Sequence, residues 1–156
     1  VILFALSYFF PILFGLAQVF ILILLLLFVI DISLIFFGKT KLQAKRIVPD
    51  KFSNGDNNTV LIEIEDNYQT TIFCTIIDEI PEQFQKRDFI INTFLKPSEE
   101  KKIKYYLRPV ERGEYMFGKT NTYISTILRL IKKRQLFDQD GVKSAVYPSF
   151  LSIKKY

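Results

Sequence analysis

The sequence has 156 residues, with 21 basic and 16 acidic side chains, a net charge of +5, one cysteine and no histidine. Without histidine the chain has no Ser-His-Asp triad, no imidazole acid–base catalyst and no histidine-ligated zinc site of its own. The lone cysteine, Cys74, forms no internal disulfide. Its place in an apolar alternating run is typical of a small buried side chain.

Residues 1–38 differ from the rest of the chain, because Asp31 is their one charged side chain. A helix over residues 16–37 would be about 33 Å long at about 1.5 Å per residue, enough to cross a hydrocarbon core of about 30 Å. This run is apolar around its whole circumference, as lipid requires. The alternative is a buried helix of a soluble protein, but a domain of about 115 further residues could not cover it. It is also too long for a cleaved signal peptide, and no basic segment precedes it.

A second apolar run, residues 1–10, precedes Pro11 and Gly15. Proline breaks helices and glycine permits turns. The sequence therefore predicts a transmembrane helical hairpin, with a first helix truncated at Val1, a turn over residues 11–15 and a complete second helix. One kinked helix is the alternative, but about 37 residues would overshoot the bilayer by nearly half. Because the chain begins inside apolar sequence, we expect it to be a fragment of a longer protein.

Asp31 lies inside the second predicted span, about 9 Å from its end at about 1.5 Å per residue. An ionisable group at such a position is costly and marks a candidate functional site. Two interpretations stay open. The carboxylate either reaches toward the interface or pairs with a neighbouring helix, which we favour, or it serves in transport or a proton relay.

The charges after the span predict its orientation. Lys39, Lys41, Lys45 and Arg46 follow the span within a few residues. Because positively charged flanks stay on the cytoplasmic side, we expect a multi-pass protein of the cell membrane with its soluble part in the cytoplasm.

From residue 42 the sequence changes to short runs in which apolar and polar residues alternate, the pattern of strands with one buried face. The clearest runs are 60–65, 71–76 and 102–107, and further candidates are 42–48, 88–96, 114–126, 130–138 and 143–147. After an anchor in residues 1–38, we therefore predict that residues 39–156 form an all-β, immunoglobulin-like antiparallel sandwich of about seven to eight strands. For residues 125–134 the alternative to a strand is a helix, but Thr126, Ile127 and Ile131 favour a strand.

Candidate sites in the β region are few. Acidic residues at 78–82, 99–100 and 138–140 lie in turn-like stretches, which predicts exposed charges and no acid–base pair. No loop has calcium-binding spacing, and the glycines form no phosphate cradle. Basic residues Arg129, Lys132, Lys133 and Arg134 follow a tyrosine-rich stretch, but strand alternation would disperse them, so we interpret them as a membrane-facing or solvated face. We predict no catalytic, cofactor or metal residue and no nucleic-acid partner.

Four short motifs occur in one order along the β region. They are Asp78 with Pro81, Arg108-Pro109 after two tyrosines, Arg112-Gly113 with Tyr115 and Gly118, and Tyr147-Pro148. In this order they resemble the N-terminal region of the domain-of-unknown-function-58 family of bacterial membrane-associated proteins, over essentially the whole chain. One segment departs from that family, since residues 125–130 lack its usual proline and glycine.

The resemblance implies that a von Willebrand factor A-type domain follows this region and that the protein works with a MoxR-type AAA+ ATPase in a chaperone or assembly system. It implies no catalytic residue. From the residues themselves, we expect Gly113 to adopt a positive φ angle. We expect Arg108 and Arg112 to bind a carboxylate such as Glu111 or Asp78. Tyr115 and Phe117 share one strand face and should fill the core.

We therefore expect a non-enzymatic, membrane-anchored β-sandwich that acts as a spacer or protein-interaction module at the cytoplasmic face of a bacterial membrane. Its partners would be the lipid bilayer and other protein subunits. One alternative is a ligand-binding module of an envelope sensor or transporter, coupled to Asp31. The other is an accessory domain of a membrane enzyme.

Overall fold

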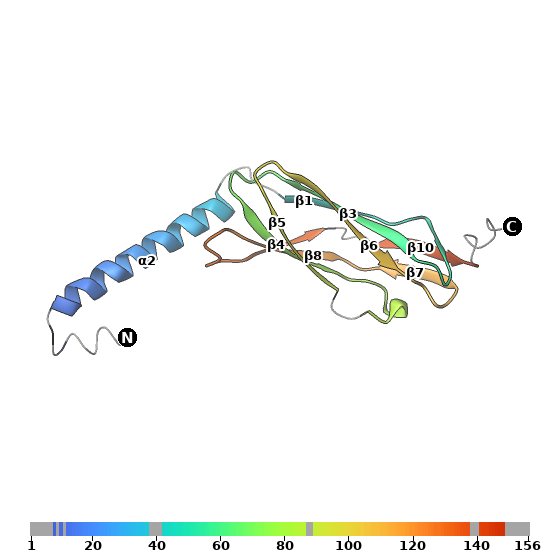
Figure 1. Cartoon of the computed structure of the whole chain (residues 1–156), viewed down its shortest axis with the longest axis horizontal. Coiled ribbons are helices and arrows are strands. Elements are labelled where there is room, and N and C mark those ends of the chain that lie inside the picture. Colours follow the sequence, from blue (N-terminus) through green and yellow to red (C-terminus); the bar gives the residue numbers. More distant parts are fainter. Residues whose placement is uncertain are drawn as a thin grey trace.

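One long helix leads into a β-sandwich in this protein (Figure 1). The computed structural model describes residue 8, residue 10 and residues 12–37, 42–86, 89–137 and 141–148. Helix α2 (Ile12–Phe36) extends roughly along the long axis of the sandwich, so the two parts together form an elongated molecule.

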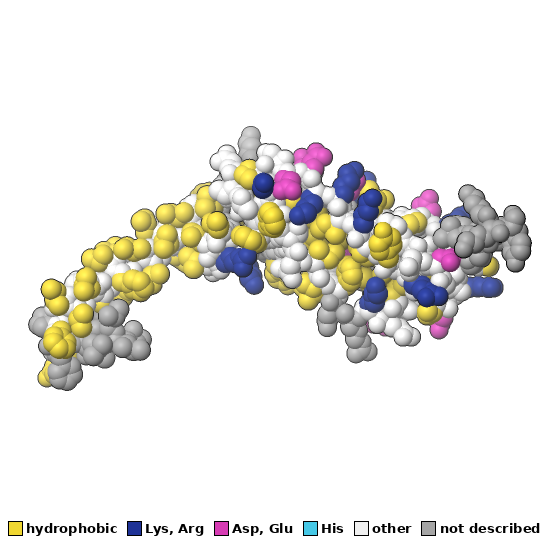
Figure 2. Space-filling model, in the orientation of Figure 1, with side chains coloured by type: hydrophobic (Ala, Val, Ile, Leu, Met, Phe, Trp, Pro, Cys, Tyr) yellow, Lys and Arg dark blue, Asp and Glu magenta, His cyan; other side chains and the backbone are white. Residues whose placement is uncertain are grey.

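Helix α2 has 25 residues, which makes it about 37 Å long and, by length and composition, able to cross a membrane. Its buried residues are Ala17, Asp31 and Ile35, while the other side chains are largely exposed and apolar (Figure 2). This pattern differs from that of a core helix, whose apolar side chains are covered by the rest of the fold.

The start of α2 corrects one prediction. The helix begins at Ile12, so Gly15 lies within it and the predicted turn over residues 11–15 is wrong from Ile12 onward. Glycine costs about 1 kcal/mol in a helix interior, which the long apolar run around it outweighs. The first helix of the predicted hairpin falls on residues 1–10, of which the structure describes only Tyr8 and Phe10, so one helix is described and the hairpin stays a prediction.

The predicted strands are largely confirmed. The strands are β1 (Leu42–Ile47), β2 (Lys51–Ser53), β3 (Asn58–Asp66), β4 (Ile72–Asp78), β5 (Ile90–Leu95), β6 (Glu100–Leu107), β7 (Gly113–Phe117), β8 (Thr120–Ser125), β9 (Lys133–Phe137) and β10 (Val142–Tyr147), with a 3-10 helix η1 (Glu82–Phe84) after β4. The short strand β2 and η1 were not predicted. The expected long strand over residues 114–126 is interrupted at Gly118 and Lys119, and residues 126–132 form a loop.

The strands form two layers. Strands β1, β3 and β6 pair in that order as one antiparallel sheet. The second layer contains β5-β4-β8-β9 and β2-β10-β7, which are continuous because only Gly118 and Lys119 separate β7 from β8. Strand β2 pairs with β10 in parallel, so the chain moves from the first layer to the second after β1.

The hydrophobic core lies between these layers and confirms the predicted alternation. Val60, Ile62 and Ile64 of β3 face inward, as do Cys74 and its alternating neighbours on β4. Four aromatic rings extend the core at the end remote from α2: Phe52, Phe84, Tyr115 and Phe117. Phe84 contacts the other three rings and Phe52 also contacts Phe117, with centroid distances of 4.8 to 6.1 Å for these pairs. Burial raises the pKa of Cys74 to about 12, so its thiol stays protonated at neutral pH, as expected for a core side chain.

Asp66 is a buried carboxylate at the end of β3. Its Oδ1 accepts a hydrogen bond from the backbone N–H of Tyr68 at 2.8 Å, and its side chain is shielded from solvent. Burial raises the pKa of Asp66 above its ordinary value, and the charge of Glu99 adds to this, although the Tyr68 hydrogen bond opposes it. The folded state therefore binds the Asp66 proton more tightly than the unfolded chain does.

This shift predicts how Asp66→Asn changes stability with pH. Because the folded pKa is raised, the stabilisation from protonated Asp66 is present below the ordinary aspartate pKa of about 3.9 and is lost as the pH rises through the folded value. Asparagine keeps the acceptor for Tyr68 and carries no charge. The free energy of unfolding is measured by denaturant titration in detergent. The value for Asp66→Asn minus that for the unsubstituted chain should increase as the pH rises from 3 to 7. A difference that shrinks with rising pH would contradict this account, and Glu65→Gln at an exposed neighbour is the matched control.

Candidate functional site

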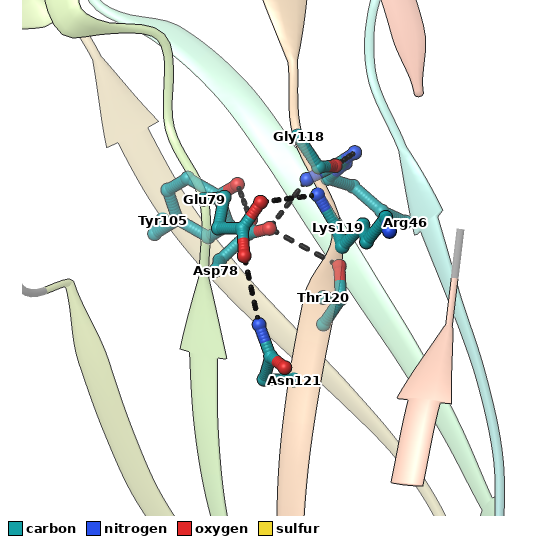
Figure 3. Close-up of polar contacts among 8 residues, drawn as sticks. All are labelled: Arg46, Asp78, Glu79, Tyr105, Gly118, Lys119, Thr120 and Asn121. Atoms are coloured by element: carbon teal, nitrogen blue, oxygen red, sulfur yellow. Dashed lines mark hydrogen bonds and ion pairs between the residues drawn. The ribbon is translucent and has the colours of Figure 1, made fainter. Parts of the chain in front are cut away.

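A buried ion pair between Asp78 and Arg46 joins the two layers of the sandwich (Figure 3). Asp78 ends β4 in the second layer and Arg46 lies on β1 in the first, and both side chains are shielded from solvent. Asp78 Oδ1 accepts from Arg46 Nη1 and, at 3.1 Å, from Thr120 Oγ1, while Oδ2 accepts from the Tyr105 hydroxyl at 2.5 Å. We call these four residues the interlayer network.

The interlayer network corrects two predictions. Asp78 is a buried carboxylate and not an exposed turn charge, and its arginine partner is Arg46. Arg108 and Arg112, which the sequence offered as partners, are both exposed. Arg46 also donates through Nη2 to the Gly118 carbonyl at 2.7 Å and lies 5.0 Å from the centre of the Phe117 ring. Arg46 is therefore not one of the membrane-flanking charges expected from the sequence, because strand alternation from Leu42 places it on the inward face.

Glu79, next to Asp78, holds the interruption between β7 and β8 in place. Its carboxylate accepts hydrogen bonds from Lys119 N at 2.9 Å and Asn121 Nδ2 at 3.0 Å, and its carbonyl accepts from Gly118 N at 2.9 Å. A Cβ atom at position 118 would lie 2.5 Å from Glu79 Oε2 and 2.7 Å from its Cβ. Only glycine therefore fits at position 118, where Glu79 packs against the chain between β7 and β8. This gives the motif residue Gly118 a structural role.

The Arg112-Gly113-Tyr115 motif forms the start of β7. Gly113 has a φ of +146°, a positive angle as predicted, which a side chain would strain. Tyr115 and Phe117 are both buried in the core, again as predicted. The Tyr115 hydroxyl donates to the Glu111 carbonyl at 2.9 Å, which is the tyrosine-corner arrangement of immunoglobulin-like sandwiches.

The remaining motif residues shape connections between strands. Pro81 is buried before η1, and its carbonyl accepts from Phe84 N at 3.0 Å. Pro109 is buried and Tyr147 is exposed, and their carbonyls accept from Gly55 N and Asn54 N, each at 2.9 Å. Pro148, like Tyr147, is exposed. These contacts fix the loops at the end of the sandwich that is remote from α2.

A second buried carboxylate, Asp31, attaches α2 to the sandwich. Its Oδ1 accepts from Thr126 Oγ1, and its Oδ2 accepts from the backbone N–H groups of Leu130 at 3.0 Å and Ile131 at 2.9 Å. Asp31 is completely buried by this contact. Its partner is thus a loop of the sandwich, and not the neighbouring helix that the sequence suggested.

The last turn of α2 adds to this attachment. Ile35 lies one turn after Asp31 on the same face and is also completely buried. Lys133 Nζ donates to the Ile35 carbonyl at 3.4 Å and lies 5.3 Å from the Phe36 ring centre. A cation at this position satisfies a carbonyl left unpaired at the helix end and interacts favourably with the helix dipole. We call these contacts of Asp31, Ile35 and Lys133 the helix–sandwich joint.

The loop that binds Asp31 comprises residues 126–132, and we call it the β8–β9 loop. Thr126 Oγ1 accepts from Leu128 N at 3.1 Å, and Arg129 has a φ of 53°, so the chain turns where the sequence predicted a strand. The Arg129 guanidinium lies 3.9 Å from the Phe73 ring centre. The basic run is therefore divided, because Arg129 and Lys132 belong to the loop while Lys133 belongs to β9 and the joint.

Both buried carboxylates bind groups that belong to other parts of the fold. The carboxylate oxygens of Asp78 and Asp31 are occupied by donors from the fold, and the Cys74 thiol is protonated and buried. Within the described residues no three His, Cys, Asp or Glu side chains are grouped as metal ligands. The interlayer network holds the two layers together, and the helix–sandwich joint fixes the helix to one end of them.

The interlayer network predicts a large loss of stability for Asp78→Asn. Removing one partner of a buried ion pair leaves the other charge uncompensated, so we expect the free energy of unfolding in detergent to fall by about 3–5 kcal/mol. The matched control is Glu63→Gln, which breaks the exposed Lys102–Glu63 pair of 2.6 Å and should cost about 1 kcal/mol or less. Equal losses for the two variants would contradict the assigned role of Asp78.

Comparisons with known proteins address the fold alone. A scan against known protein families finds no match, and no curated protein sequence is significantly similar. Among solved structures, the ASH/PapD-like domain 7 of human CEP192 matches with a TM-score of 0.53 and 13% identity over 70% of this chain and 87% of that one.

Two further structures match less well. The CARDB domain of the PF1109 protein from Pyrococcus furiosus has a TM-score of 0.45 and 12% identity, covering 70% of this chain and 96% of that one. The β-glucosidase of Listeria innocua has a TM-score of 0.36 and 12% identity, covering 71% of this chain and 16% of that one. The likeness to the PapD-like domain supports the assignment of the β region as an immunoglobulin-like sandwich.

Proposed function

We propose that this chain anchors a protein in a membrane and presents its β-sandwich as a non-enzymatic spacer or interaction module. The observation that carries the proposal is the helix–sandwich joint. It fixes an apolar, solvent-exposed helix of membrane-spanning length to one end of a folded domain.

Two features support anchoring. The exposed apolar surface of α2 is stable in lipid and unfavourable in water. The second feature supports a retained anchor over a cleaved signal sequence, which can have a similar length and apolar composition. Asp31 and Ile35 of the helix are completely buried against the sandwich, and removing the helix would leave the N–H groups of Leu130 and Ile131 without this acceptor.

The role of the sandwich rests on its chemistry. Its polar core groups bind one another and hold the layers together, and its fold resembles that of PapD-like domains. Such a domain offers a rigid surface to partners. We infer from the four motifs that the partners belong to the system of the domain-of-unknown-function-58 family, with a MoxR-type AAA+ ATPase and von Willebrand factor A-like proteins. Co-purification of that ATPase with the full-length protein tests this part.

The charges near the joint support a cytoplasmic position for the sandwich. Arg46 is engaged by Asp78, which leaves Lys39, Lys41 and Lys45 as the flanking charges in sequence. Arg129 and Lys132 of the β8–β9 loop add positive charge at the same end. Positive flanks favour the cytoplasmic side. Protease cleavage at Lys101 only after the cells are permeabilised would support this side, and cleavage in intact cells would refute it.

A ligand-binding module of a sensor or transporter is the second candidate. The observation that favours it is the helix–sandwich joint, because this joint could pass a change in the sandwich directly to α2. A surface hollow of about 820 Å³ lies beside the interlayer network, lined by Asp78, Glu79, Lys86 and Phe89 among others. A small molecule retained in this hollow by the purified protein would favour this candidate over the interaction module.

The anchoring proposal predicts that charges at the middle of α2 prevent membrane insertion. Leu22 and Leu25 are exposed near the helix centre, where an arginine costs about 2.5–3.5 kcal/mol on insertion scales. The double variant Leu22→Arg/Leu25→Arg should leave the membrane fraction on carbonate extraction, whereas Leu22→Phe/Leu25→Phe should remain in it. Retention of the arginine variant in the membrane would count against the proposal.

A further inference from the structure

The helix–sandwich joint determines how much of α2 is available to lipid. Asp31 and Ile35 are buried against the sandwich, so the part of the helix that is free of it covers residues 12–30. At about 1.5 Å per residue this segment is about 28 Å long, close to the hydrocarbon thickness of about 30 Å. If α2 crosses a bilayer, the hydrocarbon region therefore ends near Asp31.

The β8–β9 loop is held at the same level. Its Leu130 and Ile131 N–H groups and the Thr126 hydroxyl bind the Asp31 carboxylate directly. These bonds leave the loop little freedom to move away from that level. In Figure 1 the connection after β8 lies beside the end of α2, and the rest of the sandwich extends away from it.

The composition of the loop suits the boundary between lipid and water. Ile127 is 71% exposed and Leu130 is 49% exposed, so the loop presents two large apolar side chains on its surface. Arg129 and Lys132 are the charged residues of the loop, and it contains no acidic residue. Apolar side chains among cations are typical of segments that lie at anionic membrane surfaces.

The neighbouring parts of the structure agree with this placement. The β3–β4 connection, residues 67–71, and the β5–β6 connection, residues 96–99, lie at the same end, because β4 begins opposite the ends of β5 and β8. Both are polar, and Tyr68, the aromatic residue of the first, is buried. Phe36 and Phe37, by contrast, are exposed at the end of α2, where aromatic rings favour the headgroup level. Figure 2 shows apolar side chains continuing from the helix to the sandwich, with Lys and Arg side chains beside the junction.

We propose that the β8–β9 loop is a second membrane contact, which places Ile127 and Leu130 at the headgroup boundary and Arg129 and Lys132 against anionic lipid phosphates. This inference rests on the proposed membrane anchoring. It adds that the sandwich sits directly on the bilayer in a fixed orientation, and does not hang from a flexible tether. The occupant of this surface is the phospholipid bilayer that α2 crosses.

The test measures the depth of single fluorophores on the full chain in phosphatidylcholine–phosphatidylglycerol vesicles. An environment-sensitive dye is attached through Ile127→Cys. The controls carry the dye through Leu22→Cys in the helix or Val110→Cys at the remote end of the sandwich. Lipids with a nitroxide group either near the headgroup or deep in the acyl chain then quench the dye according to its depth. The buried Cys74 stays in place because its thiol is protonated at neutral pH, and Cys74→Val gives a second background.

The proposal expects shallow quenching at position 127, deep quenching at position 22 and none at position 110. It also expects Arg129→Gln/Lys132→Gln to weaken the quenching at position 127 in these vesicles. Quenching at position 22 with none at position 127 would overturn the loop contact and leave the anchor standing. Absence of quenching at position 22 would overturn both. If the dye at position 127 is shielded from water only after the MoxR-type AAA+ ATPase is added, the lipid contact is overturned in favour of a protein surface.

Discussion

The contact between Asp31 and the β8–β9 loop is the constraint on which the arrangement of this molecule depends. A carboxylate in an apolar helix is unfavourable in lipid unless donors surround it. Here the Thr126 hydroxyl and two backbone N–H groups supply these donors, and the carboxylate in turn stabilises a loop conformation that includes a positive φ at Arg129. Helix and loop therefore stabilise each other, and the contact fixes where the helix ends and the sandwich begins.

The contact can fix the orientation of the sandwich relative to the helix only if the sandwich itself is rigid. The interlayer network and the Arg46 hydrogen bond to the Gly118 carbonyl bind the two layers. Within the second layer, Glu79 joins the end of β4 to the interruption between β7 and β8. The tyrosine corner at Tyr115 and the backbone bonds of the remote loops hold the other end. Movement at Asp31 is thus transmitted to a domain whose described layers and loops are held together by these contacts, which suits both a spacer and a docking surface.

The sequence predicted the helix after residue 16 from the length of a uniformly apolar run, and most of the strands from the alternation of apolar and polar residues. Both signals are local, so a single chain displays them. It also predicted the burial of Cys74, Tyr115 and Phe117. It failed at Asp78, because a turn-like position says nothing about an arginine 32 residues earlier. It failed again at residues 126–132, since β-branched residues favoured a strand and a contact with Asp31, 95 residues away, decided otherwise.

The most direct test of this account is the spread of distances between the helix and the sandwich in lipid nanodiscs. Spin labels attached through Leu24→Cys on α2 and Tyr106→Cys on β6 occupy exposed positions on the two parts. A rigid helix–sandwich joint should give one narrow distance distribution, which broadens in Asp31→Ala and stays narrow in Ser33→Ala on the same helix. A broad distribution with Asp31 present, or a narrow one that Asp31→Ala leaves unchanged, would contradict it.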